Sequence, residues 1–146
     1  MTAPRKGITR QEAMRRVLQG MTDDSVGYAA LQTLLEEQFQ ATLHHQSAQL
    51  RALADQITAA VEPLDARRRQ RVSLVTALLG PQGDMPQLFA LLQEEAHSKA
   101  EADWAALEQM VLECKRLNTR NSDLLTEQYS IMQRVLHGEE DTYAPG

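Results

Sequence analysis

The sequence predicts an all-α protein, an elongated antiparallel hairpin or bundle of helices with coiled-coil-like packing. Leu, Ala, Gln, Glu and Arg dominate the composition, which is typical of long helices. Only 7 glycines and 5 prolines occur among 146 residues, which is too few for an all-β fold rich in turns. Apolar residues recur at alternating steps of three and four over long stretches, the spacing of a coiled coil. The length suits one domain.

A short basic helix is expected close to the N-terminus. The stretch "TRQE" at 9–12 is a capping box that would start a helix over 10–19, and Gly20 is a natural stop. The following "MTDDS" is interpreted as a linker. We therefore expect residues 1–25 to form a basic N-terminal appendage to a helical domain over 26–137.

Two further helices are predicted after this segment, over 25–61 and 64–79. Pro63 lacks a backbone donor and crowds the preceding turn, so we expect a break or sharp bend there. The apolar stripe also changes phase at this point, to Val72, Val75 and Leu79. The first of these helices has a seam formed by Leu31, Leu35, Phe39, Leu43, Gln46, Leu50, Leu53, Ile57 and Ala60.

The third main helix is predicted over 85–137. The stretch "GPQGD" is a turn, and Asp84 is a good N-cap because a glutamine follows three positions later. Gly138 is the expected stop, and residues 138–146 would form an acidic tail.

Two asparagines, Asn118 and Asn121, stand three apart in this last helix. A buried asparagine must find a hydrogen-bond partner, so it penalises wrong helix registers. The alternative is a helix that ends at Asn118, with Asn121 capping a new one. The predicted seam that contains them is Leu107, Val111, Cys114, Asn118, Asn121, Leu125, Gln128, Met132 and Val135.

The helix predicted over 85–137 is longer than the helix predicted over 25–61. Part of its seam over 118–136 then has no partner within the monomer, unless the second helix covers it. A helix with an uncovered apolar stripe binds another helix or oligomerises.

Catalysis and metal binding find little support. His44 and His45 are adjacent, so they point about 100° apart on a helix and cannot hold one metal ion together. The glycines form no phosphate-binding fingerprint. We therefore expect no enzymatic activity, no metal and no cofactor.

The charge and the cysteine content limit which cellular compartment and which kinds of partner are possible. Cys114 is the single cysteine, which fits a reducing compartment, and no stretch approaches the ~20 apolar residues of a membrane span. We expect a cytoplasmic protein without stable membrane insertion. The net charge of −5 disfavours a dedicated nucleic-acid binder. The basic N-terminal segment could still bind DNA in a regulatory role, which is one alternative function.

The stretch "CKRLNTRNSDLL" at 114–125, followed by a helix and "TYAPG", resembles the C-terminal half of FlgN-type flagellar export chaperones. Asn118 and Asn121 match the family's Asn-x-x-Asn-Gly, although a serine replaces the glycine. Tyr143 matches the tyrosine of the family's tail, although alanine replaces the glycine after it. The resemblance covers about residues 28–146 and is most specific in this region.

This resemblance implies a cytoplasmic chaperone that binds hook–filament junction proteins. It would hold their disordered C-terminal segments, prevent premature assembly, and deliver them to the type III export gate and export ATPase. Tyr143 would dock onto the gate. The implied client-binding residues are Asn118, Asn121, Leu124, Leu125, Gln128, Met132, Val135 and Leu136.

The sequence is also compatible with other interpretations. The asparagine pair can be a polar layer of an intramolecular or homodimeric coiled coil, and the chain can be a structural protein that homo-oligomerises through the same seam. We expect a monomer or weak homodimer. Cys114 and Trp104 are expected in the core, and the arginines of 67–71 on a solvated face, paired with glutamates of the third helix. Tyr143 can also be an ordinary tail residue.

Overall fold

The computed structural model describes residues 8–143, with side chains over 8–139. Within these residues all regular secondary structure is helical, which confirms the all-α prediction. The helices are α1 (Arg10–Leu43), α2 (Ser47–Leu79), α3 (Met85–Phe89) and α4 (Glu94–Tyr143).

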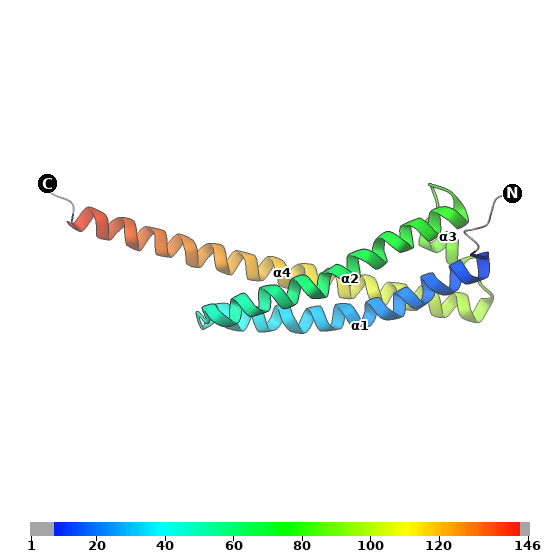
Figure 1. Cartoon of the computed structure of the whole chain (residues 1–146), viewed down its shortest axis with the longest axis horizontal. Coiled ribbons are helices and arrows are strands. Elements are labelled where there is room, and N and C mark those ends of the chain that lie inside the picture. Colours follow the sequence, from blue (N-terminus) through cyan, green and yellow to red (C-terminus); the bar gives the residue numbers. More distant parts are fainter. Residues whose placement is uncertain (1–7, 144–146) are drawn as a thin grey trace.

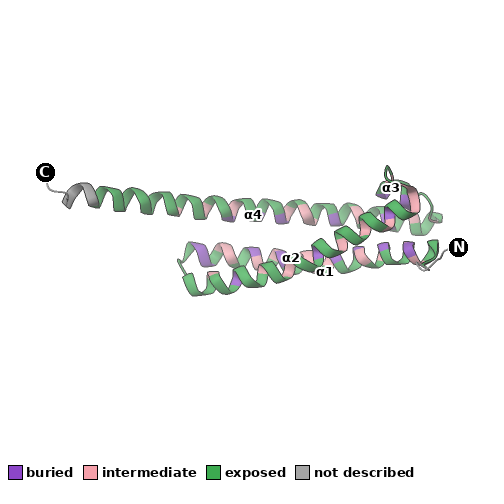
Figure 2. Cartoon of the chain, turned by 45° about the horizontal axis from the view of Figure 1, so that its top comes forward, coloured by how far each residue is buried: buried purple, intermediate pink, exposed green. Residues whose placement is uncertain are grey.

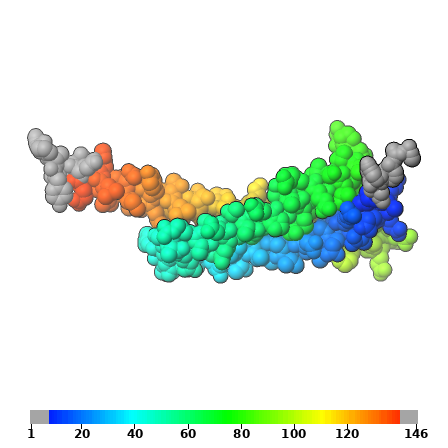
Figure 3. All heavy atoms as spheres, in the orientation of Figure 1, coloured from blue at the N-terminus to red at the C-terminus, as the bar shows by residue number. Residues whose placement is uncertain are grey.

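The three long helices lie side by side. Helices α1 and α2 form an antiparallel hairpin, and α4 runs along α1 in the same direction (Figure 1). The short helix α3 lies at the end of the bundle where α1 begins. At the other end α4 continues well past the turn of the hairpin, so the molecule is elongated (Figure 3).

Residues 10–25, expected to belong to a separate N-terminal appendage, are part of the bundle; residues 1–7 lie outside the described part of the chain. The Thr9 side chain caps α1 by accepting a hydrogen bond from the Glu12 amide, as the sequence predicted. Helix α1 does not stop at Gly20, so the prediction of a short helix over 10–19 and a linker was wrong. A helical glycine costs only about 1 kcal/mol. The core residues around it outweigh that cost; they are Ala13, Val17 and Met21.

The turn of the hairpin lies at residues 44–46, inside the helix predicted over 25–61, so that prediction was wrong. The Gln46 amide donates to the Ala41 carbonyl (2.9 Å) and the His45 amide to the Thr42 carbonyl (3.2 Å). This is the Schellman arrangement that ends many helices, and it requires a left-handed residue. His45 takes that role with φ 53°. Because histidine replaces the usual glycine, the sequence carries no local signal for this turn.

Helix α2 runs unbroken through Pro63, so the predicted break was also wrong. An interior proline costs about 3 kcal/mol. Packing on both sides of it opposes that cost. Leu64 is buried against α1, where Gly27 leaves room for it: a Cβ at residue 27 would lie 2.8 Å from Leu64 Cδ2.

The segment predicted as one helix over 85–137 forms two. Asp84 caps α3 as predicted, but α3 ends at Phe89, and α4 starts at Glu94. The buried Phe89 packs edge-on against Trp104, with ring centroids 6.4 Å apart, so Trp104 is half-buried at the edge of the core. Helix α4 passes through Gly138 to Tyr143, so the expected stop was wrong as well.

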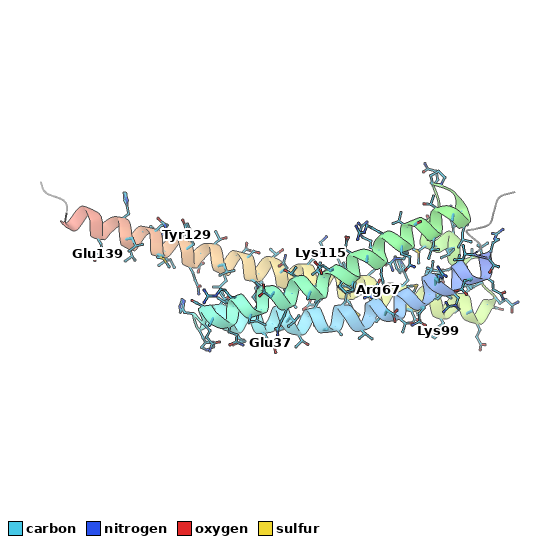
Figure 4. All side chains as sticks on the ribbon, viewed as in Figure 1. Glu37, Arg67, Lys99, Lys115, Tyr129 and Glu139 are labelled. Carbon is cyan, nitrogen blue, oxygen red and sulfur yellow. The ribbon has the colours of Figure 1, made fainter. Side chains whose placement is uncertain are left out.

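A buried ion-pair cluster ties α1 to α2. The Asp24 carboxylate is 1% exposed and accepts hydrogen bonds from Arg67 Nε and from Arg71 Nη1, the latter at 2.8 Å. The Arg71 guanidinium also lies over the Trp104 ring of α4. The remaining arginines of 67–71 pair with Asp65 of their own helix. The expectation that these arginines pair with glutamates of the last helix was therefore wrong (Figure 4 labels Arg67).

Candidate functional site

Three α4 side chains donate hydrogen bonds to backbone carbonyls of α1, and the spacing is seven residues on both helices. The three bonds are Cys114 Sγ to Tyr28 O (3.6 Å), Asn121 Nδ2 to Leu35 O (2.8 Å) and Gln128 Nε2 to Thr42 O (3.0 Å). Burial raises the pKa of the Cys114 thiol, which keeps it protonated and able to donate. We call these three hydrogen bonds the ladder. They hold α4 parallel to α1 and fix the heptad register between the two helices.

Asn121 is the centre of this ladder. It is 1% exposed and also donates to Gln38 Oε1 at 2.8 Å, while Arg120 Nε donates to its side-chain oxygen. The Arg120 guanidinium lies over the Phe39 ring, 3.6 Å from its centroid. The interpretation as an intramolecular polar layer therefore holds for Asn121.

Asn118 differs from its neighbour. Helix α4 is continuous through both asparagines, so the alternative of a helix end at Asn118 was wrong. The Asn118 side chain is exposed and lines a groove between α2 and α4. The two asparagines thus have different roles: Asn121 sets the register with α1, and Asn118 faces solvent.

The side chains of α4 that face α1 differ from the predicted seam at every second position. Cys114, Asn121 and Gln128 face α1 as predicted, but between them the residue one place earlier in the chain faces α1. Leu117 is fully buried where Asn118 was expected, and Leu124 is more buried than Leu125. Adjacent helical residues point about 100° apart, so this shift moves the predicted positions to the flank of the seam. Leu125 is therefore exposed although α1 reaches its level.

Beyond Gln128, none of the described residues of α1 or α2 covers the apolar face of α4. Leu43 ends α1 at the level of residue 129 of α4, so 130–143 project by roughly 21 Å at about 1.5 Å per residue. Figure 2 shows this part of α4 as exposed throughout its coloured length. Six large apolar side chains of α4, which begin three residues before Gln128 and continue past the end of α1, are between 41% and 62% exposed: Leu125, Tyr129, Ile131, Met132, Val135 and Leu136. We call these six residues, with Leu124, the projecting face.

Two of these residues, Tyr129 and Ile131, were missed by the sequence analysis (Figure 4 labels Tyr129). Ile131 follows Gln128 at the three-residue step of the observed seam, so the correct register would have found it. A hollow of about 920 Å³ lies where the hairpin ends, between His45 and this part of α4. The opposite side of α4 is polar, which makes the projecting end amphipathic; its residues are Thr126, Ser130, Gln133, Arg134 and His137.

The remaining candidate, Tyr143, is the last residue of α4. Its side chain and residues 144–146 lie outside the described part of the chain. Among the described residues, no group of three or more His, Cys, Asp or Glu side chains is arranged to hold a metal ion. No helix there has a stretch apolar and long enough to cross a lipid bilayer.

A sequence model of the FlgN protein family matches residues 14–137. The chain belongs to the FlgN family. Membership implies a role in flagellar export as a chaperone of hook-associated proteins, and the FlgN family is not known for enzymatic activity. The match confirms the resemblance seen in the sequence. It begins at residue 14, so it also includes most of the first half of α1. No curated protein and no solved structure gives a match.

The contrast between the two FlgN-type asparagines gives a direct prediction. Asn121→Ala is expected to lower the free energy of unfolding by about 1–3 kcal/mol, because it removes a buried donor from Leu35 O and Gln38. Asn118→Ala is expected to stay within about 0.5 kcal/mol, because its side chain is exposed. Urea denaturation followed by circular dichroism measures both, and equal losses would contradict the assignment.

Proposed function

We propose that the chain is a cytoplasmic export chaperone whose projecting face binds the C-terminal segments of hook-associated proteins. It keeps these clients from assembling early and delivers them to the gate and ATPase of the flagellar type III export apparatus. One observation carries the proposal. The seam that packs α4 onto α1 continues beyond the end of α1 as an exposed apolar stripe, within a chain of the FlgN family.

The physical basis is coupled folding and binding. A disordered client segment would fold as an amphipathic helix against the projecting face and bury its own apolar stripe there. The ordering cost limits the affinity, which suits a client that must be released. Met132 adds an adaptable surface, because an unbranched thioether side chain can pack against different partners.

The polar residues divide between two roles in this proposal. Asn118 is exposed and offers an amide to the client. Asn121 and Gln128 act indirectly, since their amides hold α4 against α1 and so aim the projecting end away from the hairpin. Tyr143 would dock onto the export gate, as a small aromatic anchor with a hydroxyl group.

Co-purification from the native host, with identification of the bound chains, tests the proposal. The expected result is retention of hook-associated proteins, and loss of that retention when their C-terminal segments are deleted. Light scattering at several protein concentrations completes the test. A tight dimer that takes up no client would contradict the proposal and favour a structural coiled coil closed by a second copy.

A further inference from the structure

A groove runs between α2 and α4, with α1 as its floor. The backbones of α2 and α4 each pack on α1 but stay apart from one another. The space between them holds two hollows, of about 460 Å³ and 280 Å³. Both are lined by Tyr28, Val111 and Lys115, so they are neighbours along the same side of α4. Ile57 and Val61 form its α2 wall at one end.

A second stripe on α4 connects this groove to the projecting face. In the groove it consists of Val111, Lys115 and Asn118. Through Ser122 it continues, at alternating steps of three and four, as Leu125, Tyr129, Met132 and Leu136. This stripe lies on the flank of the seam that α1 occupies, so packing against α1 leaves it open.

The shape and the charges indicate the kind of occupant. A groove walled by three helices is the place of a fourth helix, and a helix satisfies its own backbone hydrogen bonds in an apolar setting. The stripe from Val111 to Leu136 extends roughly 38 Å at about 1.5 Å per residue. Arg116 and Arg120 are each held in an ion pair, whereas Lys115 has none among the described side chains (Figure 4 labels Lys115). Lys115 is exposed at the rim of the groove, so an acidic side chain of the occupant at that level would form an ion pair with it.

We propose that the client segment binds as this fourth helix, along the flank stripe of α4 and into the α2–α4 groove as far as Lys115. The inference rests on the proposed function and extends it: the client has an apolar stripe of about seven turns and an acidic residue facing Lys115. A client on the projecting face alone would reach only the hairpin turn and the start of α2. Contact with the groove wall at Val61 is therefore the property that separates the two arrangements.

Site-specific photo-crosslinking measures this contact. A photoreactive phenylalanine analogue replaces Val61 on the groove wall, Ala59 on the outer face of α2, or Tyr129 on the projecting face. Ala59 is exposed and points about 160° away from Val61, so it is the matched control. The probe is the C-terminal segment of a hook-associated protein from the same cell. We expect client crosslinks from Val61 and Tyr129 and none from Ala59.

Affinities provide a second measurement. Asn118→Arg and Lys115→Glu are expected to weaken binding of this segment about tenfold, through steric blockage and charge reversal in the groove. The control Thr119→Arg, on the outer side of α4, is expected to change it less than about twofold.

The outcomes separate the inference from the proposed function. Crosslinks from Tyr129 without any from Val61 would overturn the groove and leave the projecting face as the client site. Equal affinities of Asn118→Arg and Thr119→Arg would overturn it too. Absence of crosslinks from both Val61 and Tyr129 would overturn both proposals. A crosslinked homodimer from Val61, without client, would assign the groove to a second copy and also overturn the inference.

Discussion

Replacing Leu125 and Met132 together by glutamate is expected to abolish retention of hook-associated proteins while leaving the helix content unchanged. In the free chain these side chains are 41% and 55% exposed, so the new carboxylates stay in water and cost little. In the complex they would be buried against an apolar client without partners, which opposes binding strongly. We expect the dissociation constant to rise by about 100-fold or more.

Pull-down with a full-length hook-associated protein and circular dichroism measure this effect. The matched control is Thr126→Glu with Gln133→Glu, which adds the same charge at the same level on the polar side of α4. The control is expected to bind as the unchanged chain does. Unchanged binding by the Leu125/Met132 variant would contradict the client site. A loss of helicity would instead mean that these residues support the fold.

Asp24→Ala is expected to lower the free energy of unfolding by about 3–5 kcal/mol. The carboxylate is almost fully buried and is shared by two arginines, Arg67 and Arg71. Its removal leaves two guanidinium groups partly buried between α1, α2 and the Trp104 ring without an acceptor. Urea denaturation, followed by the helical signal, measures the loss.

Asp65→Ala is a matched control for this prediction, because Asp65 also bridges two arginines. Its side chain is 47% exposed and its partners lie on the same helix, so the loss is expected below about 1 kcal/mol. A similar loss in both variants would contradict a stabilising role specific to the buried cluster. A loss confined to Asp24→Ala would show that the buried ion pairs of Asp24 stabilise the packing of α1 against α2.

Capping signals predicted two helix starts correctly, and the glycine after Leu79 one helix end, whereas other glycine and proline signals for helix ends were wrong. Thr9 and Asp84 cap helices as expected, because a cap acts through hydrogen bonds to amides three residues away. Gly20 and Pro63 did not end helices. Their costs of about 1 and 3 kcal/mol are local, whereas the apolar side chains next to them are buried by distant segments. The turn at His45 was missed because its left-handed residue is not a glycine.

The sequence by itself determined that the chain is helical, that α4 has a heptad stripe with polar members, and that this region resembles the C-terminal half of FlgN-type chaperones. It could not determine which flank of the stripe meets α1. Leu124 and Leu125 are both leucine and point about 100° apart, so periodicity alone does not distinguish them.

Only the tertiary structure decided that question. The hydrogen bonds of Asn121 and Gln128 to α1 select one register, bury Leu117 and leave Leu125 outside. The turn after Leu43 then ends α1 while α4 continues. An apolar face stays exposed where its partner helix stops, and the place where that partner stops is set by contacts between segments 86 residues apart in the chain.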